Sequence, residues 1–111
     1  MKVPSINKTE TLILTALSFK ELYGLAIIDK VEDISYAKVK LSLGGLYTTL
    51  HRMEEKGLLE SRWGESTDAR QGARRKYYKP SGLGVRALQE ATRGYTAVIT
   101  YGLNPTCAGA L

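Results

Sequence analysis

The spacing of apolar residues changes at Gly57, within the stretch LSLGGLYTTLHRMEEKGLLESRW (residues 41–63). Before this glycine, apolar residues recur every three or four positions, at Leu43, Leu46, Leu50 and Met53. That spacing predicts an α-helix over 43–56 with one buried face, and glycine is a residue at which helices commonly end. After the glycine, residues 58–63 alternate between two faces, as a half-buried strand does. The chain is therefore predicted to run from a helix directly into a strand.

Helical spacing also predicts two earlier helices, over residues 8–20 and 25–34. Either Asn7 or Thr9 can cap the first helix, because a side-chain oxygen there accepts a hydrogen bond from a free N–H group of the first turn. The inward-facing residues of the second helix are predicted to be Leu25, Ile28 and Val31, with Ile27 and Ile34 as further candidates. The link over 35–42 contains a short segment that favours a strand, and its last residue can cap the next helix.

The rest of the chain predicts a hairpin followed by a fourth helix. Residues 58–63 and 74–81 alternate as strands, and the polar segment between them is typical of a hairpin tip. Helical spacing returns over 81–102, which predicts a C-terminal helix, and residues 103–111 are expected to fray. This order predicts an α+β, mainly α fold. It is a winged helix-turn-helix with a C-terminal helix, in which residues 1–80 form a DNA-binding domain.

Basic residues are concentrated in the predicted hairpin. Residues 38–80 hold ten of the 16 Lys and Arg residues and five of the 11 Asp and Glu residues. Within residues 70–79 there are five basic residues and no acidic one. A local cluster of this kind favours a polyanionic partner, namely double-stranded DNA, although a solvated basic hairpin remains the alternative.

The predicted helix over 43–56 carries small, hydroxylated and cationic side chains opposite its apolar stripe. Two adjacent glycines remove side-chain bulk at its start, and an arginine can bond guanine edges or phosphate. Tyr47 lies on the border, where core packing and a phosphate contact are equally open, and Arg52 could instead pair with Glu55. The predicted DNA-binding residues are Ser42, Gly44, Gly45, Tyr47, Thr48, His51 and Arg52 in the helix, and Arg70, Arg74, Arg75 and Lys76 in the hairpin.

Other function classes have little support in the sequence. The chain has one histidine, His51, and one cysteine, Cys107, and no convergent acid–base or nucleophile set. We therefore expect no enzyme activity, no metal site and no cofactor. No apolar run approaches the ~20 residues that span a bilayer, and the N-terminus lacks a signal-peptide pattern. A cytoplasmic protein with no membrane partner is the simplest expectation.

Three stretches resemble the PadR family of bacterial transcriptional regulators. They are LILTALSFKELYGLAIIDKVED, LSLGGLYTTLHRMEEKGLLESRW and RRKYYKPSGLGVRALQ, and the resemblance spans about residues 9–92. The positions that fit the family pattern are Ser42, Gly44, Leu46, Tyr47, Leu50, Arg52, Met53, Glu54, Gly57, Leu58, Arg75, Tyr77, Tyr78, Ser81 and Gly84. The chain departs from it at Gly45, where threonine is usual, at Thr48, where proline is frequent, and at Leu25, where tyrosine is common.

The resemblance implies a homodimeric winged-helix regulator, usually a repressor, that binds palindromic operators. The short segment after the hairpin is similar to the subgroup in which a single C-terminal helix forms the dimer. The predicted dimer residues are Leu88, Ala91, Tyr95 and Val98. This stripe could alternatively pack on its own domain. Two further alternatives are a repressor that senses an aromatic small molecule at the dimer interface, near Tyr95 and Tyr101, and a winged-helix adaptor for another protein.

Overall fold

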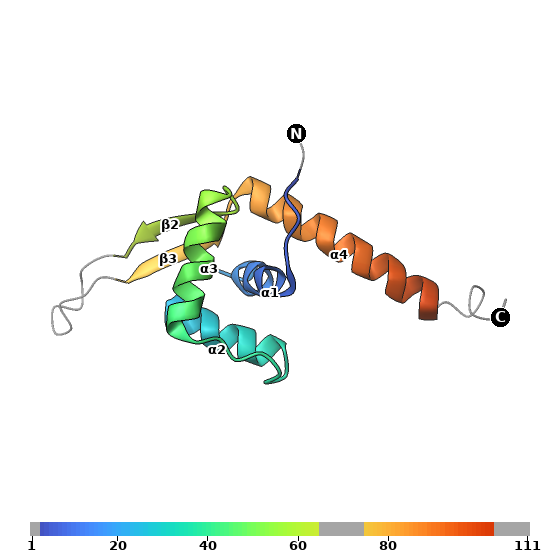
Figure 1. Ribbon diagram of the computed structural model, residues 1–111, viewed down its shortest axis with the longest axis horizontal. Helices are drawn as coiled ribbons and strands as arrows, with labels where there is room; N and C mark the ends of the chain where they lie inside the picture. The colour runs from blue at the N-terminus through green and yellow to red at the C-terminus, as the bar shows by residue number, and fades with distance from the viewer. Residues whose placement is uncertain (1–2, 65–74, 104–111) are drawn as a thin grey trace.

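Within residues 3–64 and 75–103, which the computed structural model describes, the chain forms four helices and three short strands (Figure 1). Their order is α1 (Lys8–Leu17), β1 (Leu22–Tyr23), α2 (Gly24–Ile34), α3 (Leu43–Glu55), β2 (Leu59–Trp63), β3 (Lys76–Pro80) and α4 (Gly82–Leu103). The strands form one antiparallel sheet in the order β1-β3-β2. The predicted mainly helical winged helix-turn-helix with a C-terminal helix is confirmed.

The core gathers around α1, which Figure 1 shows end-on between α2, α3 and the start of α4. Every helix and strand contributes at least one buried apolar side chain or packs directly against one. The buried cluster consists of Ile13, Leu14, Ala16, Leu17, Leu22, Ile27, Val31, Leu46, Leu50, Met53, Leu58, Leu59, Tyr78 and Ala87. The apolar stripe that predicted α3 therefore supplies three of the core residues, and its first member does not belong to them.

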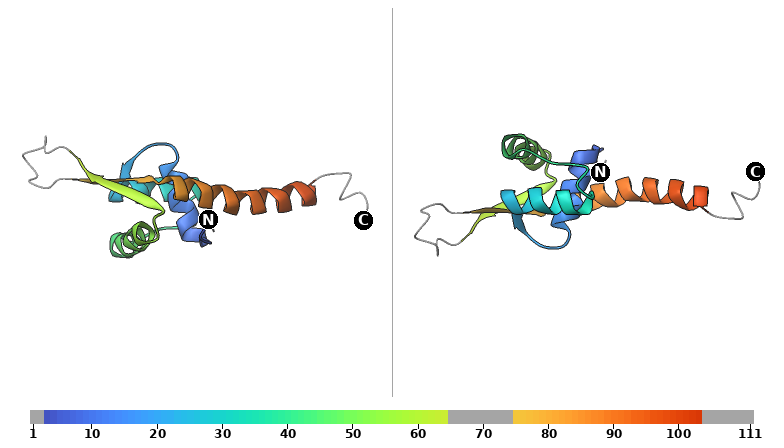
Figure 2. Two further views of the ribbon diagram at one scale, coloured as in Figure 1. Left: turned by 90° about the horizontal axis from the view of Figure 1, so that it is seen from above. Right: turned by 90° about the horizontal axis from the view of Figure 1, so that it is seen from below.

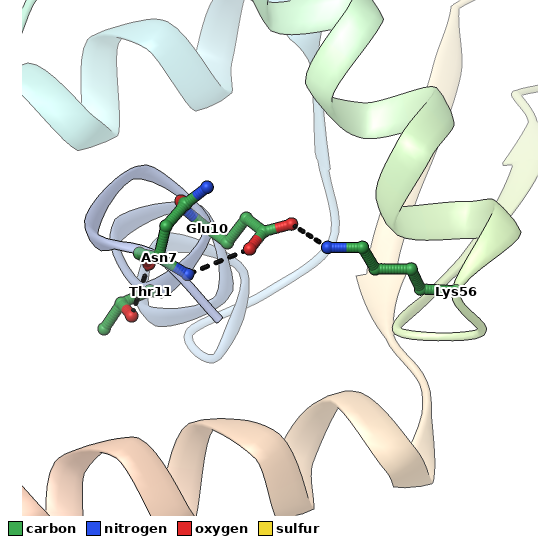
Figure 3. Close-up of polar contacts among 4 residues, drawn as sticks. All are labelled: Asn7, Glu10, Thr11 and Lys56. Carbon is green, nitrogen blue, oxygen red and sulfur yellow. Dashed lines mark hydrogen bonds and ion pairs between the residues drawn. The ribbon is translucent and has the colours of Figure 1, made fainter. Parts of the chain in front are cut away.

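A buried carboxylate joins the start of α1 to the end of α3 (Figure 3). Asn7 caps α1, since its side chain accepts from the Glu10 N–H at 2.8 Å while Glu10 Oε1 accepts from the Asn7 N–H at 2.9 Å. The second carboxylate oxygen, Glu10 Oε2, accepts from Lys56 Nζ at 3.0 Å. Of the two predicted caps, Asn7 is the one used. The reciprocal capping pattern also fixes the direction of the Glu10 side chain toward Lys56.

The predicted strand segment in the link 35–42 is wrong. This link is a turn, in which Tyr36 and Ala37 both adopt positive φ, at 55° and 63°. The Ala37 N–H donates to the Glu32 carbonyl at 2.7 Å, which closes the end of α2. The third strand is β1 instead, and it pairs with β3. Because β1 has only two residues, its sequence shows no alternation, and the strand could not be predicted from it.

Gly57 ends α3, as predicted, and does so with φ +79°, a conformation that glycine adopts without steric cost. The Leu58 N–H then donates to the Met53 carbonyl at 2.9 Å. Farther along, the Ser81 hydroxyl accepts from the Gly84 N–H at 3.0 Å and caps α4. The two turns are joined by a hydrogen bond, in which the Ser81 N–H donates to the Leu58 carbonyl at 3.0 Å.

The wing, defined as β2 and β3, extends from one end of the molecule, and the second half of α4 extends from the other (Figures 1 and 2). The first turns of α4 pack on the core through Ala87, with Leu83 and Leu88 partly buried beside it. Among the described residues, none of the helices has the length and apolar character of a membrane-spanning segment. The predicted frayed tail, residues 103–111, begins at the last residue of α4, and residues 104–111 lie outside the described part of the chain.

Candidate nucleic-acid interface

The N-terminal turn of α3 lies open at the surface. Ser42 caps this helix as predicted, since its Oγ accepts from the Gly45 N–H at 3.2 Å. A methyl group built on Gly44 meets no atom within 4 Å, and one on Gly45 meets only the Ser42 Oγ at 3.0 Å. The backbone here can therefore be approached closely from outside.

The remaining predicted residues of α3 share this exposed face. Thr48 is exposed, and its hydroxyl donates to the Gly44 carbonyl at 3.1 Å. His51 Nε2 lies 3.6 Å from Glu55 Oε1, one helical turn away. Arg52 is exposed, and the alternative partner considered for it, Glu55, is placed beside the histidine instead. An exposed arginine flanked by a threonine and a histidine offers donors to a base edge or a phosphate.

Tyr47 lies at the surface, so the alternative of pure core packing is wrong, whereas its phosphate contact stays a prediction. Its side chain is 46% exposed, so it is not a core residue. The ring lies over the first residue of α2, because a methyl group built on Gly24 would meet the Tyr47 hydroxyl oxygen at 2.7 Å. Tyr47 thus spans the surface between the starts of α3 and α2.

Glu54 ties α3 to both strands of the wing. Its Oε2 accepts from the Ser61 hydroxyl at 2.8 Å, and its Oε1 lies 3.6 Å from Lys76 Nζ. The same ammonium lies 5.7 Å from the ring centroids of both Trp63 and Tyr78. Burial raises the pKa of the Tyr78 phenol, and the nearby Glu54 carboxylate raises it further. The sequence places Glu54 among the positions that fit the family pattern, but its contacts with the two strands gave no signal there.

The other face of β3 carries a row of stacked cations and rings. The Arg75 guanidinium lies 4.4 Å from the Tyr23 ring centroid, and the Tyr23 and Tyr77 rings meet edge to face at 5.8 Å. Arg62 lies 5.1 Å from the Tyr77 ring and binds Glu21 through two hydrogen bonds of 2.9 and 3.0 Å. These bonds lower the pKa of the Glu21 carboxyl. Arg75, the residue before β3, and Lys76, the first residue of β3, therefore stack on different rings, those of Tyr23 and Trp63.

A groove of ≈ 560 Å³ separates α3 from the wing, and we call it the α3–wing groove. Its lining includes Leu25, Leu43, Tyr47, Trp63, Arg75 and Lys76. The prediction that Leu25 and Leu43 point into the core is wrong, because they are 57% and 42% exposed. Leu43 is the first residue of α3 and Leu25 the second of α2, so both lie where a helix has not yet reached the core.

Four of the predicted side chains fall where the structure gives no description. Arg70 and Arg74 lie in the segment 65–74, outside the described residues. Tyr95 and Val98 belong to α4 by their backbone, and their side chains lie outside the described part. Of the predicted dimer residues, Leu88 and Ala91 are partly exposed.

The geometry combines an open helix start, an exposed arginine and a basic two-stranded wing. The model of the transcriptional regulator PadR-like family matches residues 13–90. The chain belongs to this family. The members of the family are transcriptional regulators and not enzymes, so the predicted class of protein is confirmed.

Solved PadR-like structures show the same fold. A PadR-like regulator from Bacillus cereus strain ATCC 14579 is 30% identical, with a TM-score of 0.67 over 83% of this chain and 84% of that one. A PadR family regulator from Clostridium difficile R20291 is 26% identical, with a TM-score of 0.71 over 86% and 95%. PadR from Bacillus subtilis, solved in complex with operator DNA, is 18% identical, with a TM-score of 0.66 over 78% and 47%. This last likeness is one of fold alone.

Proposed function

We propose that this PadR-like chain is a dimeric repressor that binds palindromic operators, with α3 in the major groove and the wing on the sugar-phosphate backbone. The observation that carries the proposal is the open first turn of α3, where Gly44 and Gly45 leave the helix backbone bare, together with the exposed Arg52 about two turns further along the same helix. Helix N-termini favour phosphate, and arginine bonds guanine edges with two hydrogen bonds. Such a regulator acts in the compartment that holds the DNA, here the cytoplasm.

The dimer in this proposal is formed by α4. The second half of α4 leaves the body of the domain (Figure 2). Helical spacing in the sequence places Leu88, Ala91, Tyr95 and Val98 on one face of such a helix. A twofold dimer through this face sets the two copies of α3 about one DNA turn, ~34 Å, apart. Residues 1–80 are then the DNA-reading domain, and 81–102 the dimerisation helix.

Selection of bound sequences from a random duplex pool tests this function directly. We expect an enriched palindrome, and Arg52→Ala to cost ~1–3 kcal/mol and to relax preference at one base pair. Arg75→Ala should weaken all duplexes alike and flatten the salt dependence by about one unit of slope, because it removes one phosphate contact. Fluorescence anisotropy at several salt concentrations measures both. A chain that remains monomeric and binds no duplex at low ionic strength contradicts the proposal.

Gly44→Ala is expected to separate DNA binding from folding. The added methyl group enters open space, so alanine should raise helix stability by up to ~1 kcal/mol while it weakens operator binding about tenfold or more. Gly82→Ala is the matched control, because that glycine is also exposed, also in a first helical turn and also without neighbours within 4 Å. It should leave operator affinity unchanged. Equal affinities for the two variants would show that DNA does not approach the start of α3.

A further inference from the structure

The outer part of the wing lies beyond the core. Leu59 and Tyr78 are the buried residues of its two strands, each 4% exposed, and Ser61 pairs with Tyr78 in the sheet. The residues farther from the core are half-buried or exposed, namely Arg62, Trp63, Lys76 and Tyr77. The α3–wing groove, with its volume of ≈ 560 Å³, lies between this part of the wing and α3. Apolar packing therefore does not by itself fix how far the outer wing stands from α3.

Glu54 joins α3 to the outer wing at this groove. Its Oε2 accepts from the Ser61 hydroxyl of β2 at 2.8 Å, and its Oε1 lies 3.6 Å from Lys76 Nζ of β3. Glu54 is on the last turn of α3, after the residues of this helix that are predicted to bind DNA. The side chains of Glu54 and Lys76 are 29% and 35% exposed, so the ion pair is partly shielded from water. One carboxylate of α3 therefore contacts both strands of the wing.

The charge of Lys76 is engaged within the chain. Besides the Glu54 carboxylate at 3.6 Å, its ammonium lies 5.7 Å from two aromatic ring centroids of the wing. Arg75, one residue earlier, is exposed and stacks on the Tyr23 ring at 4.4 Å. Within the described residues no carboxylate forms an ion pair with Arg75, and a stacked guanidinium keeps N–H donors at its edge for phosphate. Arg75 is therefore available to DNA, whereas Lys76, although predicted to bind DNA, is held by Glu54.

We propose that Glu54 is a positioning residue for operator recognition, an inference that rests on the proposed function. Through Ser61 and Lys76 it sets the distance between α3 and the wing, so that both meet the duplex together, and it keeps the Lys76 ammonium away from phosphate. A helix and a wing that are already fixed relative to each other lose less freedom on binding. Binding to an unrelated duplex depends mainly on charge. The carboxylate should thus raise the affinity for the operator and lower that for other DNA.

Glu54→Gln, measured by fluorescence anisotropy on the selected palindrome and on an unrelated duplex, tests the direction of this effect. The amide has one acceptor oxygen and no charge, so it cannot hold Ser61 and Lys76 on separate oxygens. Operator affinity should fall about tenfold, since the wing must then be ordered on binding. Affinity for the unrelated duplex should stay equal or rise, because one negative charge is removed and Lys76 is released. An operator affinity that is unchanged or raised, or an equal loss on both duplexes, overturns the proposal.

Further variants identify the partner of Glu54 and control for charge. Lys76→Met should weaken operator binding about as much as Glu54→Gln, and the double variant should bind no more weakly than either single one, because all three break the same connection. The salt dependence should keep its slope in Lys76→Met, whereas Arg75→Ala lowers it by about one unit. Glu60→Gln is the control, since Glu60 is exposed on β2 and forms no ion pair within the described residues, so it should not weaken operator binding. Additive losses, or a lower slope for Lys76→Met, would assign Lys76 to phosphate instead.

A measurement without DNA separates this inference from the proposed function. In the weakly aligned parent chain, residual dipolar couplings of the backbone N–H groups in α3, β2 and β3 should fit one alignment tensor. In Glu54→Gln the couplings of the wing should shrink relative to those of α3, whereas Glu60→Gln should leave their ratio unchanged. Equal ratios in the parent chain and in Glu54→Gln overturn the positioning role, whatever the chain binds. If the parent chain selects no palindrome, the proposed function fails, and the couplings still decide whether Glu54 holds the wing.

Discussion

Replacing Lys56 by methionine is expected to lower the free energy of unfolding by about 3 kcal/mol. The Glu10 side chain is 2% exposed, and Lys56 Nζ is its cationic partner at 3.0 Å. Without that partner the carboxylate keeps its bond to the Asn7 N–H but stays buried as an uncompensated charge, and removing one member of a buried pair is strongly destabilising. Urea denaturation followed by circular dichroism measures the loss.

Replacing Glu10 by glutamine should lower the free energy of unfolding much less than replacing Lys56 by methionine does. Glu10→Gln can still accept from the Asn7 N–H, and Lys56, whose side chain is 38% exposed, can turn into water. We expect a loss of about 1 kcal/mol, and the double variant should be more stable than Lys56→Met alone. Lys40→Met is the control, because Lys40 is 72% exposed and lies 3.9 Å from Glu32, an ion pair that contributes at most ~1 kcal/mol. Equal losses for Lys56→Met and Lys40→Met would show that Glu10 is hydrated in solution.

The cap of α1 can be predicted from the sequence, whereas the ion pair between Glu10 and Lys56 cannot. Asparagine followed three residues later by glutamate is a helix-start pattern, so the cap of α1 could be predicted, although Thr9 remained an equal candidate. The partner Lys56 is 46 residues away, and nothing in local spacing shows that the end of α3 returns to the start of α1. Periodicity reports which face of a helix is buried, whereas the partner across the core depends on how the helices cross.

In the candidate site, too, the features set by local spacing could be predicted from the sequence, and those set by contacts between elements could not. The exposed face of α3 follows from helical spacing, since burial of Leu46, Leu50 and Met53 leaves the opposite side to solvent. The contacts of Glu54 with Ser61 and Lys76 require α3, β2 and β3 to meet, so no single segment of the sequence could predict them. Burial is predicted wrongly at helix ends for a related reason. Spacing places Leu43 on the apolar stripe, but the first turn of α3 extends past the core.

Gly84→Ala is expected to lower the free energy of unfolding by about 3 kcal/mol, at the upper end of the usual cost of overpacking. A methyl group on Gly84 would lie 2.1 Å from the Leu58 carbonyl oxygen and 3.3 Å from Leu14 Cδ2. The carbonyl cannot move away cheaply, because it accepts from the Ser81 N–H at 3.0 Å. Relief of the clash must therefore displace the start of α4 from Leu58, the residue just before β2.

Gly82→Ala, two residues earlier, provides the contrast. Its methyl group meets no atom within 4 Å, so alanine should raise stability by up to ~1 kcal/mol through helix propensity. Denaturation midpoints of the two variants should thus move in opposite directions from that of the parent chain. Because α4 also forms the dimer in the proposed function, Gly84→Ala should weaken self-association as well, which sedimentation measures. If both alanine variants are stabilised, the close approach of α4 to Leu58 does not persist in solution, and the glycine there is not required by packing.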